Sequence, residues 1–61
     1  MTVKYAVTFE FDERPPVTHR GAVEGTQVNV CVSRATRAAQ AALRPKGWSS
    51  VVVVLLERVS G

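Results

Sequence analysis

Apolar and polar residues alternate strictly at the start of the chain. From Val3 to Phe11 each odd position holds a valine or an aromatic residue, whereas the even positions include Lys4 and Glu10. A period of two places alternate side chains on opposite faces of a strand. The pattern therefore predicts a strand with one buried and one solvated face. Residues 12–16 include two consecutive prolines, which donate no backbone hydrogen bonds, and predict a turn.

A second, weaker strand pattern follows from about Val17 to Glu24. Because the connection to the first strand is short, we expect the two strands to form an antiparallel hairpin. Gly21 lies inside the second strand. An isolated glycine in a strand predicts a bulge or a sharp bend at that position.

The segment from about Gln27 to Arg44 admits two interpretations. Residues 28–32 alternate between valine and smaller or polar residues, so they alone could form a strand, with Ser33 capping a shorter helix. The wider window favours one long helix, because at about 100° per residue its apolar and polar residues separate onto two faces. The apolar face holds Val28, Cys31, Val32, Ala35, Ala38, Ala39, Ala42 and Leu43. Thr26 is the expected N-cap, and Pro45 is expected to end the helix.

The longest apolar run is the six-residue segment from Val51 to Leu56, which predicts a last strand. Its alternation sends Val51, Val53 and Leu55 to one face and Val52, Val54 and Leu56 to the other. One helix covers one face of a small sheet. We therefore expect the second face, or the open edge of this strand, to contact another chain, with an oligomer interface at Val52, Val54 and Leu56.

The order strand, strand, helix, strand predicts the fold class. We expect an α+β protein with topology ββαβ, formed by a single domain over residues 1–61. A long crossover through the helix brings the third strand beside the first, which gives a three-stranded antiparallel sheet of order 2-1-3 with the helix packed on one face. The odd residues of the first strand and the alanine-rich side of the helix form the expected core.

Chain length and composition indicate the expected oligomeric state and cellular compartment. A chain of 61 residues buries only about 60% of its unfolded surface, so association, most simply as a homodimer, is one route to stability. No segment reaches the roughly 18 apolar residues of a membrane span. The alternating N-terminus is unlike a secretion signal. The single cysteine, Cys31, fits a reducing cytoplasm and excludes a cysteine-ligated zinc site within one chain.

The basic residues are unevenly distributed. Residues 25–56 carry four basic residues and no acidic one, which could attract phosphates or an acidic protein surface. Arg34, Arg37 and Arg44 lie on the polar side of the expected helix and are the candidate nucleic-acid contacts. A solvated helix face is the commoner explanation, because nucleic-acid surfaces usually carry more charge or place stacking aromatic residues among it.

Catalytic chemistry has little support in the sequence. His19 is the sole histidine and has no recognisable nucleophile or orienting carboxylate beside it, so a surface position on an edge strand is expected. Cys31 is expected to be a small buried residue, and Trp48 to close the core between the helix and the last strand. Glu10 and Asp12 lack the ligand spacing of a calcium loop, and the glycines match no nucleotide-binding motif. We expect a non-enzymatic protein without a metal or cofactor.

The chain also resembles a group of known proteins. The hairpin YAVTFEFDERPPVTHRGAV, followed by GTQVNVCVSRATRAAQAALRPKGWSSVVVVLLER, resembles small uncharacterised proteins of actinobacteria-infecting bacteriophages in its overall pattern and in its use of arginine, alanine and valine. The resemblance implies a role in the host cytoplasm through binding a host or phage macromolecule, and it assigns no functional residue. We therefore expect a self-associating module for protein–protein interaction through the C-terminal strand, with nucleic-acid binding through the helix as the alternative.

Overall fold

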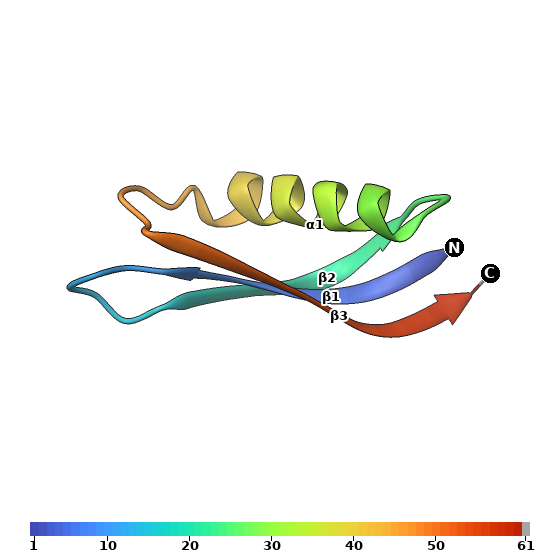
Figure 1. The fold of residues 1–61 in the computed structure, drawn as a ribbon, viewed down its shortest axis with the longest axis horizontal. Helices are drawn as coiled ribbons and strands as arrows, with labels where there is room; N and C mark the ends of the chain where they lie inside the picture. The colour runs from blue at the N-terminus through green and yellow to red at the C-terminus, as the bar shows by residue number, and fades with distance from the viewer. Residues whose placement is uncertain (61) are drawn as a thin grey trace.

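The computed structural model describes residues 1–60 and shows one helix running along one face of a three-stranded sheet (Figure 1). The elements are β1 (Thr2–Glu10), β2 (Val17–Glu24), α1 (Val28–Leu43) and β3 (Ser50–Ser60). The sheet has the order β2-β1-β3, and both strand pairs are antiparallel. The expected α+β class and ββαβ topology are confirmed. Gly61, the last residue of the expected domain, lies outside the described residues.

The segment after the hairpin is one continuous helix, so the interpretation of residues 28–32 as a strand is excluded. The expected N-cap is wrong: Gln27 occupies the cap position, with extended backbone angles of φ −140° and ψ 159° and no capping bond from its side chain. Its carbonyl accepts the first helical hydrogen bond, from the Cys31 N–H at 3.1 Å. Because the chain stays extended through Gln27, Thr26 lies outside the first turn.

The helix ends at the expected place, just before Pro45. Arg44 adopts the left-handed conformation, with φ 46°, and its N–H donates to the Gln40 carbonyl at 2.9 Å. A proline disfavours helical angles in the residue that precedes it, so Arg44 leaves the helical region as the chain turns toward β3.

The bulge expected at Gly21 is absent, because β2 pairs with β1 in one unbroken register from Glu24 to Val17. Gly21 has a packing role instead. It is the cross-strand neighbour of Tyr5, and a Cβ atom at this position would lie only 2.7 Å from the Tyr5 hydroxyl oxygen. A side chain would occupy the space of the ring, so the glycine lets the Tyr5 phenol lie flat over β2.

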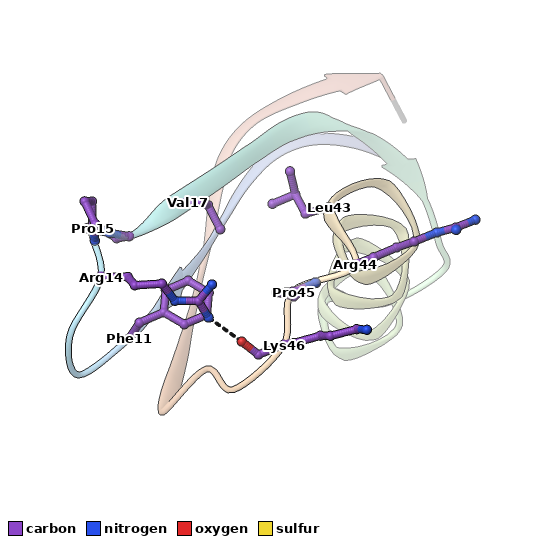
Figure 2. Close-up of a pocket in the computed structure, with 9 residues that line it drawn as sticks. Phe11, Arg14, Pro15, Val17, Leu43, Arg44, Pro45 and Lys46 are labelled. Atoms are coloured by element: carbon purple, nitrogen blue, oxygen red, sulfur yellow. Dashed lines mark hydrogen bonds between the residues drawn. The ribbon is translucent and has the colours of Figure 1, made fainter.

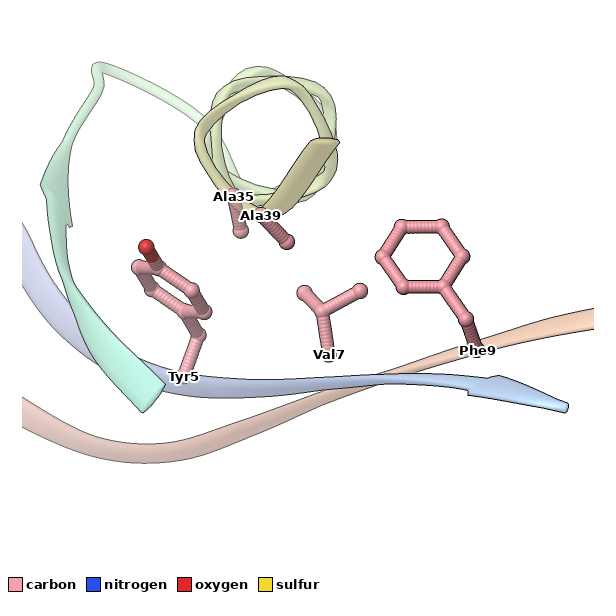
Figure 3. Packing of buried hydrophobic residues seen from close by; sticks show 5 residues of the cluster. All are labelled: Tyr5, Val7, Phe9, Ala35 and Ala39. Atoms are coloured by element: carbon pink, nitrogen blue, oxygen red, sulfur yellow. The ribbon is translucent and has the colours of Figure 1, made fainter. Parts of the chain in front are cut away.

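The core forms between the centre of β1 and the small residues of α1, as expected. Tyr5, Val7 and Phe9 project from β1 toward Ala35 and Ala39 on the facing side of the helix (Figure 3). All five side chains are at most 2% exposed. Alanine on the contact side lets the helix approach closely enough for the larger strand residues to fill the layer.

The last strand packs on the core with one of its two apolar rows. Val51, Val53 and Leu55 contact the core cluster and remain partly buried. They pair with Phe9, Val7 and Tyr5 of β1. The register then shifts between Lys4 and Tyr5 and again between Thr2 and Val3. The register shifts of this sheet therefore lie between β1 and β3. None lies between β1 and β2, where Gly21 predicted one.

We predict that Gly21→Ala destabilises the fold by about 1–3 kcal/mol, because the new methyl group overlaps the Tyr5 ring. Equilibrium unfolding in urea, followed by Trp48 fluorescence at a fixed protein concentration, measures the loss. Adding Tyr5→Phe removes the closest oxygen atom, so the double variant should recover at least about 0.5 kcal/mol beyond additivity. Strictly additive effects would contradict the steric explanation.

Candidate interaction surfaces

The face of the sheet opposite α1 carries an exposed apolar row on β3. Val52 and Val54 are each 45% exposed, and Leu56 is 52% exposed. These are the residues expected at an oligomer interface. The alternation of the strand places them on the side that the helix does not cover, whereas their neighbours in sequence pack against the core. We call this side of the sheet the open face.

Short side chains occupy the part of the open face beside the apolar row. On β1, Ala6 lies between Arg20 of β2 and Val54 of β3 in the strand register, and these longer neighbours leave it only 8% exposed. Thr8 and Thr18 form a cross-strand pair whose hydroxyl oxygens lie 2.8 Å apart. Because their hydroxyls bond to each other, this part of the face presents methyl groups and few unsatisfied polar atoms.

Polar pairs bound the apolar row at both ends. At one end, Lys4 and Glu57 form an ion pair with 3.7 Å between Nζ and Oε2. At the other end, the Ser50 hydroxyl donates to Glu10 Oε1 at 2.8 Å. The open face therefore combines an apolar centre with a polar rim, which is the usual composition of a protein interface.

The helix arginines do not form one uniform surface. The Arg34 guanidinium donates to the Glu24 carbonyl at 2.6 Å and so ties the first half of α1 to the end of β2. Arg37 is exposed on the middle of the helix, and Arg44 lies at the left-handed position that ends it. The three candidate nucleic-acid contacts thus share an element, but one of them is already engaged with the protein backbone.

A cleft of about 550 Å³ opens where the β1–β2 loop meets the C-terminal end of the helix. The Arg14 guanidinium carbon lies 4.1 Å from the centroid of the Phe11 ring, and the same group donates a hydrogen bond to the Lys46 carbonyl (Figure 2). No pattern in the sequence predicts this cleft. Phe11 only continues the alternating pattern of β1. Arg14 and Lys46 are 32 positions apart in the sequence, so nothing in the sequence indicates that they lie close together.

The other candidate residues, His19, Cys31 and Trp48, are wholly or partly buried in the fold. His19 lies on β2, half-buried, with its ring centroid 5.8 Å from that of Tyr5. Cys31 is fully buried, as expected. Trp48 packs against Phe9 at a centroid distance of 5.5 Å but stays 37% exposed, so it closes the core only in part.

Among residues 1–60, no group of three or more histidine, cysteine, aspartate or glutamate side chains is placed to hold a metal ion. The single helix among the same residues is too short and insufficiently apolar to cross a membrane.

We predict that the helix arginines differ in their effect on stability. Arg34→Gln should lower the free energy of unfolding by about 0.5–1.5 kcal/mol, because it removes a charged donor from the Glu24 carbonyl. Arg37→Gln is the matched control and should leave stability unchanged, since an exposed charge contributes little. Urea denaturation of both variants measures the difference, and equal midpoints would show that the bond of Arg34 adds nothing to stability.

Comparisons with known proteins add no assignment to these surfaces. No protein-family model, no curated protein and no solved structure matches the chain.

Proposed function

We propose that this chain is a non-catalytic binding protein that self-associates, as a dimer, through the open face of its sheet. The single observation that carries the proposal is the exposed row formed by Val52, Val54 and Leu56, with exposed fractions of 45–52%. Three large apolar side chains in a continuous row are an unusual use of surface in so small a chain, and such patches commonly mark interaction sites.

The energetic argument follows from burial. Fully burying a valine or leucine side chain contributes about 1.5–3 kcal/mol, so covering the exposed half of each residue in the row would contribute roughly 1 kcal/mol apiece. Whole domains are stable by only about 5–15 kcal/mol. Association that buries this row would therefore add appreciably to the stability of the chain.

The position of the row favours packing of face against face over pairing of edges. If two β3 strands paired along their open edges, the combined sheet would still expose Val52, Val54 and Leu56, because edge pairing leaves both faces of the sheet as they are. Packing two open faces about 10 Å apart would bury the row of each chain against the other. A twofold axis would make the two contacts identical.

The contact must extend beyond the apolar row. A standard interface buries about 800 Å² per partner, which is roughly a fifth of the 4191 Å² accessible to this chain. The short side chains of Ala6, Thr8 and Thr18 allow a partner sheet to approach over β1 and β2 as well. Arg20 and the pair of Lys4 with Glu57 would then lie at the polar rim.

The biological setting is proposed from the resemblance to phage proteins. A small phage-encoded protein of this kind would act in the cytoplasm of the infected host by binding a host protein. The free, buried thiol of Cys31 fits a reducing compartment. In this proposal the chain supplies a binding surface and performs no chemistry of its own.

Nucleic-acid binding through Arg34, Arg37 and Arg44 is the rival proposal. The exposed positions of Arg37 and Arg44 support it, and the hydrogen bond from Arg34 to Glu24 counts against it. The dependence of affinity on salt concentration distinguishes the two proposals. Affinity that depends on phosphate contacts falls steeply as the salt concentration rises, whereas the affinity of an apolar interface does not. Retention on heparin that is lost in a triple Arg→Gln variant would favour the rival.

We predict that the protein sediments as a dimer at high micromolar concentration and that Val52→Lys or Val54→Lys converts it to a monomer of lower stability. A charge on the open face would have to be desolvated between the two sheets. Val28→Lys is the matched control, because Val28 is 58% exposed at the start of the helix, away from the open face. Analytical ultracentrifugation measures the three variants and the unmodified chain.

Three results would contradict the proposal. One is a monomeric unmodified protein at high micromolar concentration. Another is equal disruption by Val28→Lys, which would show that added charge acts without regard to its position. The third is a dimer that survives both open-face substitutions, which would assign association to a strand edge or to the helix.

A further inference from the structure

The cleft at the end of the helix has apolar walls that come from two distant parts of the sequence. Phe11 and Val17 contribute one side from the β1–β2 hairpin, and Leu43 and Pro45 contribute the other side from the end of α1 (Figure 2). A volume of about 550 Å³ lies within the range of about 300–1,000 Å³ that is typical of binding pockets. Val17 remains 38% exposed beside it.

Prolines and a hydrogen bond restrict the backbone on both sides of the cleft. Pro15 and Pro16 restrict the backbone of one wall, and Pro45 restricts the other. The hydrogen bond from Arg14 to the Lys46 carbonyl joins the two walls. A preformed site loses less conformational freedom on binding, which favours recognition of a ligand that presents a complementary apolar group.

The charged residues that line the cleft are all basic. Arg14, Arg44 and Lys46 are among its lining residues, and no acidic side chain is. Arg14 lies over the cleft, whereas the ends of Arg44 and Lys46 extend away from it on the helix side (Figure 2). Asp12 and Glu13 line an adjoining hollow at the hairpin tip, which shares Phe11 and Arg14 with the cleft. The cleft thus has apolar walls with the Arg14 guanidinium beside them, while the exposed side chains of Arg44 and Lys46 add positive charge outside its rim.

These features favour a protein ligand over a nucleic acid. A base needs an accessible aromatic face on which to stack, but the Arg14 guanidinium already covers one face of the Phe11 ring at 4.1 Å. The remaining walls are aliphatic or proline, which suit a leucine or phenylalanine side chain. Carboxylates on either side of that side chain would complement the neighbouring cations.

We propose that the cleft between the β1–β2 loop and the end of α1 binds an acidic segment of a partner protein, with one large apolar side chain inserted between Val17 and Leu43. The cleft lies on the helix side of the sheet, whereas self-association is assigned to the opposite side. The proposal therefore goes beyond the proposed dimer, and either can fail without the other.

The test uses a synthetic peptide with a central Leu-Phe pair flanked by three glutamates on each side. Titration into ¹⁵N-labelled protein, followed by heteronuclear NMR, identifies the residues whose amide signals shift and gives the dissociation constant. One control peptide replaces Leu-Phe by Gly-Ser and keeps the charge. A second replaces the glutamates by glutamines and keeps the apolar pair. A single-stranded thymidine oligonucleotide serves as the nucleic-acid probe.

Two variants test the cleft from the protein side. Val17→Asp places a charge in the apolar wall, and Lys46→Glu reverses a charge at the rim. Each should weaken peptide binding by about tenfold or more, which corresponds to roughly 1.4 kcal/mol. Arg37→Glu is the matched control for charge reversal, because it lies on the helix outside the cleft, and it should change the affinity by less than about twofold. If Val17→Asp fails to fold, Lys46→Glu and the control peptides still decide the result.

The expected result is signal shifts confined to residues 11–17 and 43–48, with both control peptides binding more weakly than the test peptide. Equal binding of the Gly-Ser peptide would overturn the proposal, because the apolar cleft would then play no part. Tighter binding of the oligonucleotide at the same residues would also overturn it and assign the site to nucleic acid. Absence of any saturable binding of the test peptide would do the same.

Discussion

The packing of β1 against the small residues of α1 is the contact on which the rest of the structure depends. Tyr5, Val7 and Phe9 fill the layer beneath Ala35 and Ala39, and none of the five is more than 2% exposed. Because the helix presents alanine at the contact, its backbone can lie close to the middle strand. The same packing explains Gly21, where a Cβ atom would lie 2.7 Å from the Tyr5 hydroxyl oxygen.

A single helix on a three-stranded sheet leaves the sheet covered on one side. The helix also lies closer to β2 than to β3 (Figure 2), so the core-facing row of β3 is only partly buried and its other row is exposed. β3 thus carries more large apolar side chains than the rest of the chain can cover. This imbalance between apolar surface and cover is the physical basis for the proposed association through the open face.

The two proposed contacts occupy opposite sides of the molecule. The open face is bounded by Lys4 with Glu57 at one end and by Glu10 with Ser50 at the other. The cleft lies on the helix side, where Arg14 joins the hairpin to the segment before β3. A dimer formed through the open faces would therefore present two clefts pointing outward. Such an arrangement would let one dimer bind two acidic segments and gain affinity from bivalency.

The sequence by itself determined the elements, their order and the division of each into a covered and an uncovered face. The alternation from Val3 to Phe11 and the run from Val51 to Leu56 predicted two strands, and the separated faces of residues 27–44 predicted the helix, because these periods follow directly from backbone geometry. The row formed by Val52, Val54 and Leu56 was identified in the same way, since one helix covers one face.

Only the tertiary structure decided the features that depend on contacts between distant residues. Gly21 was expected to mark a bulge, but its role is to admit the ring of Tyr5 from the neighbouring strand. The sequence places Arg34 on the polar side of the helix as a candidate nucleic-acid contact, but its guanidinium donates a hydrogen bond to the carbonyl of Glu24. The cleft was not predicted, because Arg14 and Lys46 come together only when the hairpin and the end of the helix meet. Periodicity within a segment determines which way side chains point, whereas the partner that each one meets depends on how the segments pack together.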